Sequence, residues 1–139
     1  MLKDFIEANK LTAKVFASSG EVHTSQKAAL EMGLEEDSVA KSIVLVGSGK
    51  QNILVILSGK DRIDFAKIKA LLGVSDVRLA EPEEVFEITG YEIGGVPPIS
   101  IYGVATLMDR RVAKKLEIIC GGGDELHLMR IKVDRKSVV

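Results

Sequence analysis

Residues 39–57 read VAKSIVLVGSGKQNILVIL and contain two hydrophobic runs, Val39 to Val46 and Ile53 to Leu57. Both runs are rich in β-branched residues, and the six residues between them combine glycine with polar side chains. This pattern is typical of two antiparallel strands joined by a turn. Because apolar residues follow one another without strict alternation, we expect the pair to be buried on both faces.

Helices and further strands alternate on either side of this pair. Helices are predicted at residues 2–9, at 24–32 with Thr24 as the cap, at 64–73 between Asp64 and Gly73, and from Pro82 to Gly90. Strands are predicted at residues 77–80, 101–108, 115–120 and 125–133. The sequence contains no internal repeat or linker. It therefore predicts one α/β domain over residues 1–139, with helices packed on a mixed sheet.

The composition restricts the class of protein. Of the 139 residues, 46% are hydrophobic and only 4% are aromatic, so aliphatic side chains must fill the core. No apolar run approaches the roughly 18 residues of a membrane span, and residues 1–5 lack the apolar stretch of a secretion signal. One cysteine and two histidines exclude a disulfide framework and a zinc-finger ligand set. We expect a soluble cytoplasmic protein without a membrane partner.

The net charge of −1 conceals an uneven distribution. From Arg110 to the C-terminus the chain carries eight basic and four acidic residues, a balance of +4, whereas the first 109 residues carry −5. A basic segment of this size is compatible with contact to one local stretch of phosphate, and a solvated strand face explains it as well. The charge does not indicate a protein that coats nucleic acid, and no DNA partner is expected.

Two glycine-rich segments resemble nucleotide-binding loops only in part. Gly47-Ser48-Gly49-Lys50 ends like a Walker A loop, but Val44 stands where that loop needs glycine and Gln51 where it needs serine or threonine. Gly121-Gly122-Gly123 joins two predicted strands, and no helix follows it to present an N-terminus to a phosphate. Both segments are therefore predicted to be turns.

Cys120 and His127 flank the second glycine segment and form a candidate nucleophile–base pair across a hairpin. Such a pair would indicate a thiol hydrolase of small esters. A lone cysteine in a β-rich run is more often a small buried side chain, and strand register cannot be read through three glycines. The sequence leaves both interpretations open.

Two further features suggest a ligand site. Lys41 lies in an otherwise apolar strand, on the side shared with Val39 and Ile43, so its ammonium group must reach an edge, pair with an acid or point into a cleft. The segment 90–98, GYEIGGVPP, is a dense run of constrained backbone. The N–H groups of Gly94 and Gly95, unobstructed by side chains, could converge on an oxyanion or a carboxylate.

These features occur in order with Thr-Gly-Tyr-x-x-Gly-Gly-Val-x-Pro at 89–98, a strand that ends Met108-Asp109, and three glycines before the last strand. In this combination the chain, from about Val22 onward, resembles the YbaK/ProX family of aminoacyl-tRNA editing domains, which also occurs inserted in bacterial prolyl-tRNA synthetases. The resemblance implies an α/β fold with a mixed, largely antiparallel sheet packed with helices. It also implies hydrolysis of the ester that joins a wrong amino acid to tRNA, a discrimination that a synthetase pocket alone cannot reach.

The resemblance also implies roles for individual residues. Lys41 matches the family's essential lysine and Ser42 the adjoining Ser/Thr position. The family's substrate loop matches Gly94, Gly95, Val96, Pro97 and Pro98. Asp109 and His127 are additional candidates, the first to orient Lys41 and the second to tune the attacking water. The resemblance implies no cofactor and no metal. The expected partners are an aminoacyl-tRNA and, as a hypothesis, prolyl-tRNA synthetase.

Three hypotheses follow from the sequence. The first is a free-standing trans-editing deacylase for mischarged tRNA such as Cys- or Ala-tRNA(Pro), with water or a substrate thiol as the nucleophile. The second is a module of the same fold that binds tRNA or a synthetase without catalysis, because a fold does not by itself give an activity. The third is the thiol hydrolase that uses Cys120 and His127. Lys41→Ala should abolish the first activity, and Cys120→Ala the third.

Overall fold

The predicted strand pair runs through the middle of the molecule. The computed structural model of the protein describes residues 1–22 and 24–133; His23 and residues 134–139, including three charged residues of the basic segment, lie outside this description. Strands β2 (Ala40–Gly47) and β3 (Gln51–Ser58) pair antiparallel along their whole length. The 3₁₀ turn η2 (Ser48–Lys50) closes the hairpin, and Gly49 supplies the positive φ of 76° that this turn requires. The two predicted strands and their turn are confirmed.

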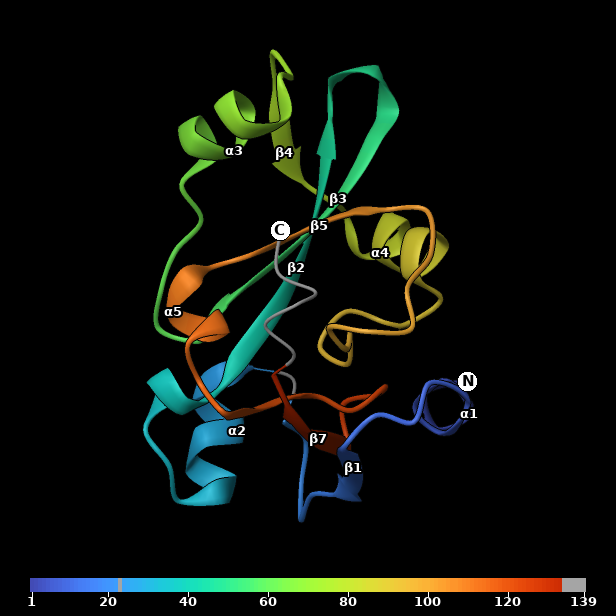
Figure 1. The fold of residues 1–139 in the computed structure, drawn as a ribbon, viewed down its shortest axis with the longest axis vertical. Coiled ribbons are helices and arrows are strands. Elements are labelled where there is room, and N and C mark those ends of the chain that lie inside the picture. The colour runs from blue at the N-terminus through green and yellow to red at the C-terminus, as the bar shows by residue number, and fades with distance from the viewer. Residues whose placement is uncertain (23, 134–139) are drawn as a thin grey trace.

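Two further strands complete a four-stranded sheet in the order β4-β2-β3-β5 (Figure 1). Strand β4 (Val77–Leu79) is antiparallel to β2, whereas β5 (Ala105–Met108) is parallel to β3. The sheet is therefore mixed, as the sequence predicted.

A second, three-stranded sheet in the order β1-β7-β6 is antiparallel throughout. It comprises β1 (Ala13–Ala17), β7 (His127–Lys132) and β6 (Glu117–Gly121). A parallel bridge between Val39 and Ile119 connects this sheet to the four-stranded one. The predicted class, an α/β fold with mixed and largely antiparallel strands, is confirmed, with the strands divided between two sheets.

Short helices cover both sheets. They are α1 (Leu2–Ala8), α2 (Ser25–Met32), α3 (Phe65–Leu72), α4 (Pro82–Thr89) and α5 (Arg110–Ala113), with the 3₁₀ turn η1 (Glu36–Ser38). The predicted caps are confirmed, because Thr24 Oγ1 and Asp64 Oδ1 each accept a backbone N–H three residues on, at 3.1 Å. None of the helices in residues 1–22 and 24–133 combines the length and apolar character needed to cross a membrane.

Apolar side chains form three clusters around the sheets. The largest joins the two sheets and includes Leu54, Ile56 and Met129. A second lies beneath α2, and a third, with Leu45 and Ile53, lies beneath α3. Figure 1 shows the corresponding arrangement, with α3 beside the hairpin tip and α2 beside the opposite end of β2. Leu54 and Ile56 belong to the first cluster and Leu45 and Ile53 to the third, so both faces of the β2–β3 pair are buried, as the sequence predicted.

Three local predictions need correction. Strand β1 was not predicted, and it pairs with β7 at the far end of the chain. The strand predicted at 101–108 is shorter, since Ser100 and Gly103 adopt left-handed backbone angles (φ 66° and 73°) that delay its start to Ala105. The short helix α5 follows Met108-Asp109, where no element was predicted.

Candidate functional site

A cavity of about 490 Å³ opens where the start of β2, the start of α2 and the loop at residues 93–96 come together. Most of its wall is apolar and includes Val39, Val85 and Leu128. The polar lining comes from Lys41, Ser42, Glu36 and the first turn of α2. A mostly apolar cavity of this size with a few polar groups is typical of a small-molecule site.

Lys41 contributes a cation to this cavity. Its Nζ donates a hydrogen bond to the Gly59 carbonyl at 3.1 Å, and the side chain is half-buried. An ammonium group has three N–H donors, so two remain for a ligand once Gly59 is bound. Of the three arrangements that the sequence allowed for Lys41, the structure shows the one in which the side chain lines a cleft.

Ser42 lines the same cavity and adds an unsatisfied group. Its Oγ is buried and has no hydrogen-bond partner within the described residues. A buried hydroxyl without a partner costs stability. The oxygen itself has almost no accessible surface, so it lies behind the cavity wall that Ser42 helps to form.

Gly59 allows α2 and η1 to approach the end of the strand pair. A Cβ at this position would lie 2.6 Å from Ser25 Cβ and 2.9 Å from the Glu36 carbonyl oxygen, so no side chain fits. The Gly59 N–H donates to the Val39 carbonyl at 2.7 Å, and next to it the Ser58 hydroxyl donates to Asp37 Oδ1 at 2.7 Å. These contacts hold the Gly59 carbonyl in the position where it accepts from Lys41.

The loop after α4 is tied at both ends by buried hydroxyl groups. Thr89 Oγ1 accepts the Tyr91 N–H at 3.0 Å, and the Tyr91 hydroxyl donates to Ser100 Oγ at 2.9 Å. All three residues are buried. The segment between them, which carries Gly94 and Val96, is therefore held against the protein rather than left free in solvent.

Backbone-to-backbone packing fixes the same loop from the other side. A Cβ at Gly121 would lie 2.3 Å from the Val96 carbonyl oxygen, and one at Gly95 would lie 2.4 Å from Asp124 Cα. The Gly123 N–H donates to the Gly95 carbonyl at 2.9 Å. The loop at residues 94–98 and the glycine segment at residues 121–123 thus pack directly on each other, and each needs glycine for this close approach.

The structure brings part of the predicted site together. Lys41, Ser42, Gly94 and Val96 line the cavity. The other loop residues lie behind this lining: Gly95 against Asp124, Pro97 fully buried, and Pro98 half-buried. The Gly95 N–H donates to the Glu92 carbonyl at 3.0 Å, so it is not available to pair with the Gly94 N–H on an oxyanion.

The two additional candidates, Asp109 and His127, lie outside the cavity lining. Asp109 caps α5, where its Oδ1 accepts the Arg111 N–H at 2.8 Å. His127 Nδ1 lies 2.7 Å from Asp124 Oδ1, and this hydrogen bond lowers the pKa of the Asp124 carboxyl. Both side chains therefore have structural partners of their own, and the position of neither indicates contact with Lys41.

Cys120 lines the wall of the cavity but does not form a pair with His127. Its thiol donates to the Met129 carbonyl at 3.6 Å, and Met129 is the residue opposite it on β7. Burial raises the pKa of the Cys120 thiol, which keeps it protonated. A protonated, buried thiol is a poor nucleophile, so the geometry argues against the thiol hydrolase.

Several residues of the cavity had no role in the sequence prediction. They are Ser25 and Gln26 at the start of α2, Glu36 in η1, and Gly59 after β3. The capping pattern at Thr24 predicted where α2 begins, but it did not indicate that the first residues of α2 line a cavity. Gly59 has the sequence pattern of an ordinary turn after a strand, and only the three-dimensional contacts show why it must be glycine.

The chemistry available in this cavity is simple. Its lining combines Lys41, which carries an ammonium group, with a few polar residues and an apolar wall. In residues 1–22 and 24–133, no group of three or more acidic, histidine or cysteine side chains is placed to hold a metal ion. The arrangement suits a ligand with a small apolar part and an oxygen that carries or develops negative charge, which an ammonium group stabilises.

Comparison with known proteins identifies the family. The sequence profile of the aminoacyl-tRNA editing domain matches residues 19–136, which is most of the chain. The chain belongs to this family. The residues matched include the loop at 94–98, the glycine segment at 121–123 and the whole lining of the cavity.

Individual relatives agree with this assignment. Proline–tRNA ligase of Halalkalibacterium halodurans is 28% identical over 130 residues, 93% of this chain and 23% of the ligase. The chain spans about a fifth to a quarter of the length of the proline–tRNA ligases that it matches. The uncharacterized protein YwhH of Bacillus subtilis is 38% identical over 78 residues, 56% of this chain and 49% of YwhH.

Solved structures share the fold at similar identity. A protein described as "a putative trans-editing enzyme for prolyl tRNA synthetase" superposes with a TM-score of 0.84 at 32% identity, over 94% of this chain and 83% of that one. The hypothetical protein APE2540 superposes with a TM-score of 0.88 at 29% identity, over 94% of this chain and 87% of that one. The fold is therefore that of the editing-domain relatives.

Proposed function

We propose that this protein is a trans-editing deacylase, which hydrolyses the ester bond of tRNA(Pro) mischarged with a small amino acid such as cysteine or alanine. The observation that carries the proposal is the position of Lys41, which lines a mostly apolar cavity and, within the described residues, uses one of its three ammonium donors on Gly59. Family membership and the prolyl-tRNA relatives support the choice of an aminoacyl-tRNA as the substrate.

Each part of the cavity has a role in the proposal. The apolar wall accepts the small side chain of the amino acid, and the 490 Å³ volume leaves room for part of the terminal nucleoside. Lys41 contacts the terminal nucleotide or the aminoacyl group, and Ser42 forms the adjoining part of the wall that the substrate contacts. The loop at 94–98 positions the aminoacyl carbonyl through its backbone, with Gly94 and Val96 in the lining and Gly95, Pro97 and Pro98 as its support.

The reaction needs no nucleophile from the protein. A water oxygen attacks the ester carbonyl carbon, the bond from that carbon to the ribose oxygen breaks, and the ribose oxygen takes up a proton to become a hydroxyl. For a cysteinyl ester, the thiol of the substrate can attack in place of water. Negative charge that develops on the carbonyl oxygen is stabilised by the nearby ammonium group in a site of low dielectric.

A synthetase is the proposed partner. Segments of proline–tRNA ligases match this chain, which supports prolyl-tRNA synthetase as the protein that works with it on the same tRNA. A tRNA substrate would place the protein in the cytoplasm. In the assay below, addition of prolyl-tRNA synthetase should then increase the rate of deacylation.

The test is deacylation of a panel of purified aminoacyl-tRNAs by the wild-type protein and by Lys41→Ala. We expect release of one or two small amino acids by the wild type and a loss of at least about 100-fold in the variant, the scale at which removal of one charge-stabilising group acts. Lys67→Ala is the matched control, because Lys67 lies on α3 and not in the cavity lining.

Other outcomes would redirect the proposal. If the wild type binds tRNA but releases no amino acid while a known deacylase works in parallel, the protein is a binding module. Retention of activity in Lys41→Ala would remove Lys41 from the mechanism. Loss of activity in Cys120→Ala with an intact fold would return the thiol hydrolase to consideration.

A further inference from the structure

A second, smaller concavity lies on the outer face of the three-stranded sheet. It has a volume of about 230 Å³ and is lined by Lys14, Phe16, Met32 and Arg130, which we call the basic groove. Lys14 and Phe16 share one face of β1 because strand side chains alternate. The register places Arg130 opposite Lys14, and Met32 is the last residue of α2.

The charges at the basic groove are arranged at a cost to the free protein. Lys14 and Arg130 are directly opposite cross-strand neighbours, and like charges in that position destabilise a sheet. Lys132 is also exposed on β7, two residues further on and so on the same face. Glu117 offsets part of this charge, with its Oε1 3.8 Å from Arg130 Nε, and the balance of these four side chains is +2. An anion bound between Lys14 and Arg130 would relieve their repulsion.

The groove also carries an aromatic ring. Phe16 lies two residues along β1 from Lys14, is half-buried, and packs against the apolar cluster beneath α2. Cations that hold phosphates beside an aromatic side chain that stacks on a base are the usual combination in proteins that bind single-stranded RNA. An acidic protein partner would use the cations but would have no particular use for the ring.

Helix α2 links the basic groove to the large cavity. Its first residues line the large cavity and its last residue lines the basic groove. Eight residues at 1.5 Å each give about 12 Å, which about four stacked nucleotides can span at roughly 3.4 Å each. A strand of RNA whose end occupied the cavity would therefore have its next few phosphates within reach of Lys14 and Arg130.

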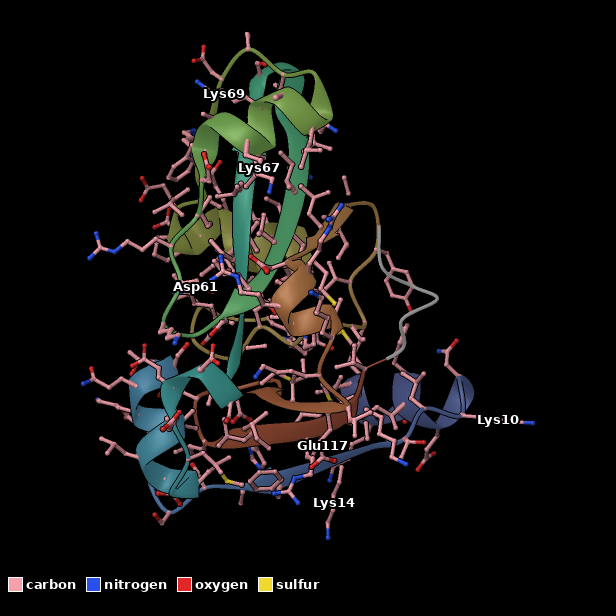
Figure 2. The ribbon with its side chains drawn as sticks, turned by 60° about the vertical axis from the view of Figure 1, so that its left-hand side comes forward. Lys10, Lys14, Asp61, Lys67, Lys69 and Glu117 are labelled. Carbon is pink, nitrogen blue, oxygen red and sulfur yellow. The ribbon has the colours of Figure 1, made fainter. Side chains whose placement is uncertain are left out.

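We propose that the basic groove is an RNA exosite, which holds phosphates and one base of the tRNA a few nucleotides from the end bound in the cavity. The identity of the RNA rests on the proposed function; the groove itself does not. Figure 2 shows that Lys14 projects from the end of the molecule opposite Lys67 and Lys69, which lie on α3. These two lysines give a matched control of equal charge far from the groove.

The test compares tRNA binding by fluorescence anisotropy, between 50 and 200 mM salt, for the wild type and two double variants. We expect K14Q/R130Q to weaken binding about tenfold at low salt and to reduce the slope of log K against log salt by about 1.4, roughly 0.7 for each lost single-strand phosphate contact. K67Q/K69Q should bind as the wild type does. Because K14Q/R130Q removes a repulsion, it should also unfold at the same or higher urea concentration than the wild type.

Three results would overturn the exosite. The first is wild-type affinity for tRNA in K14Q/R130Q. The second is an equal loss of affinity in both double variants, which would indicate diffuse attraction only. The third is a K14Q/R130Q variant that keeps its tRNA affinity but binds prolyl-tRNA synthetase more weakly, which would indicate a protein interface.

Kinetics separate this proposal from the editing function. K14Q/R130Q should lower kcat/KM for aminoacyl-tRNA about tenfold more than for aminoacylated adenosine. If the wild type bound tRNA through the groove but hydrolysed neither substrate, the editing function would fail and the exosite would stand.

Discussion

The two ends of the β2–β3 pair differ in composition although they belong to the same strands. Toward the hairpin, Leu45 and Ile53 are cross-strand partners, both 0% exposed, in an apolar cluster on one face of the strands that extends as far as Leu57. At the cavity end, Lys41, Ser42 and Ser58 occupy the strands, and Ser58 is 1% exposed. Figure 1 shows these ends far apart, one beside α3 and the other near α2.

This difference indicates that apolar residues of the strand pair mainly stabilise the fold, whereas the polar residues near the cavity mainly serve the site. Burial of apolar side chains at the hairpin end contributes stability roughly in proportion to the area removed from water. Polar groups at the cavity end are costly to bury and are retained where they bind a partner or a ligand. Substitutions at Leu45 and Ile53 should therefore change stability alone, whereas substitutions of the residues that line the cavity should change activity.

The largest expected effect is on stability, at the hairpin end. Ile53→Ala should lower the free energy of unfolding by about 2–5 kcal/mol, because it leaves a cavity in a fully buried cluster. Urea unfolding at neutral pH measures this change, and kcat/KM per folded molecule should stay within about twofold of the wild type. If Ile53→Ala does not fold, Ile53→Val should lose about 0.5–1.5 kcal/mol. A large fall in kcat/KM from the folded variant would contradict this difference in roles.

The elements that the sequence predicted well are those specified by neighbouring residues. The β2–β3 pair depends on two apolar runs and the turn between them, and the caps Thr24 and Asp64 lie three residues from the N–H groups that they accept. Strand β1 was missed because, among the strands of residues 1–22 and 24–133, it pairs with β7 alone, whose Ile131 lies opposite Ala13. A run of five residues that includes a lysine carries little strand signal until that distant partner is present.

The same distinction between local and distant determinants applies to the candidate site. Lys41 was identifiable because a charge inside an apolar run is a local anomaly with few explanations. Ser25, Glu36 and Gly59 line the cavity for a different reason, since they meet only when α2 and η1 pack on the end of β3. The contact between Gly121 and the Val96 carbonyl could not be predicted either, because the sequence does not show which glycine packs against which carbonyl.

A smaller effect, on activity, should follow from a change in the cavity wall at Gly121, which touches the loop at residues 94–98. Gly121→Ala would place a Cβ 2.3 Å from the Val96 carbonyl oxygen, so the loop that carries Gly94 must shift. We expect kcat/KM for the aminoacyl-tRNA substrate to fall about tenfold, on the scale at which misplacement of a binding group acts. Gly20→Ala is the matched control, because a Cβ at Gly20 meets nothing within 4 Å and should leave kcat/KM unchanged. Wild-type kinetics in Gly121→Ala would show that the position of the loop is not critical.

The smallest expected effect concerns the ion pair and hydrogen bond next to Gly59, and it depends on pH. The hydrogen bond from Ser58 lowers the pKa of the Asp37 carboxyl, and Lys115, whose Nζ lies 3.7 Å from Asp37 Oδ2, acts in the same direction. A carboxyl whose pKa is lower in the folded state stabilises the protein above its unfolded pKa of about 3.9, and this contribution disappears as the pH falls through the folded pKa. Ser58→Ala should therefore be less stable than the wild type at pH 7, by less than Ile53→Ala.

The difference between the two proteins should shrink as the pH falls below about 4, because protonation of Asp37 removes the charged acceptor that the hydroxyl stabilises. Urea midpoints of the wild type and Ser58→Ala at several pH values between 7 and 3 measure this difference directly, and carboxyls common to both proteins cancel. A gap of constant size down to pH 3 would mean that Ser58 acts through packing alone. In that case the hydrogen bond between Ser58 and Asp37 would not help to hold the Gly59 carbonyl that accepts from Lys41. The only polar groups at the cavity end with a role would then be those of residues in the cavity lining, within the part of the chain that the structure describes.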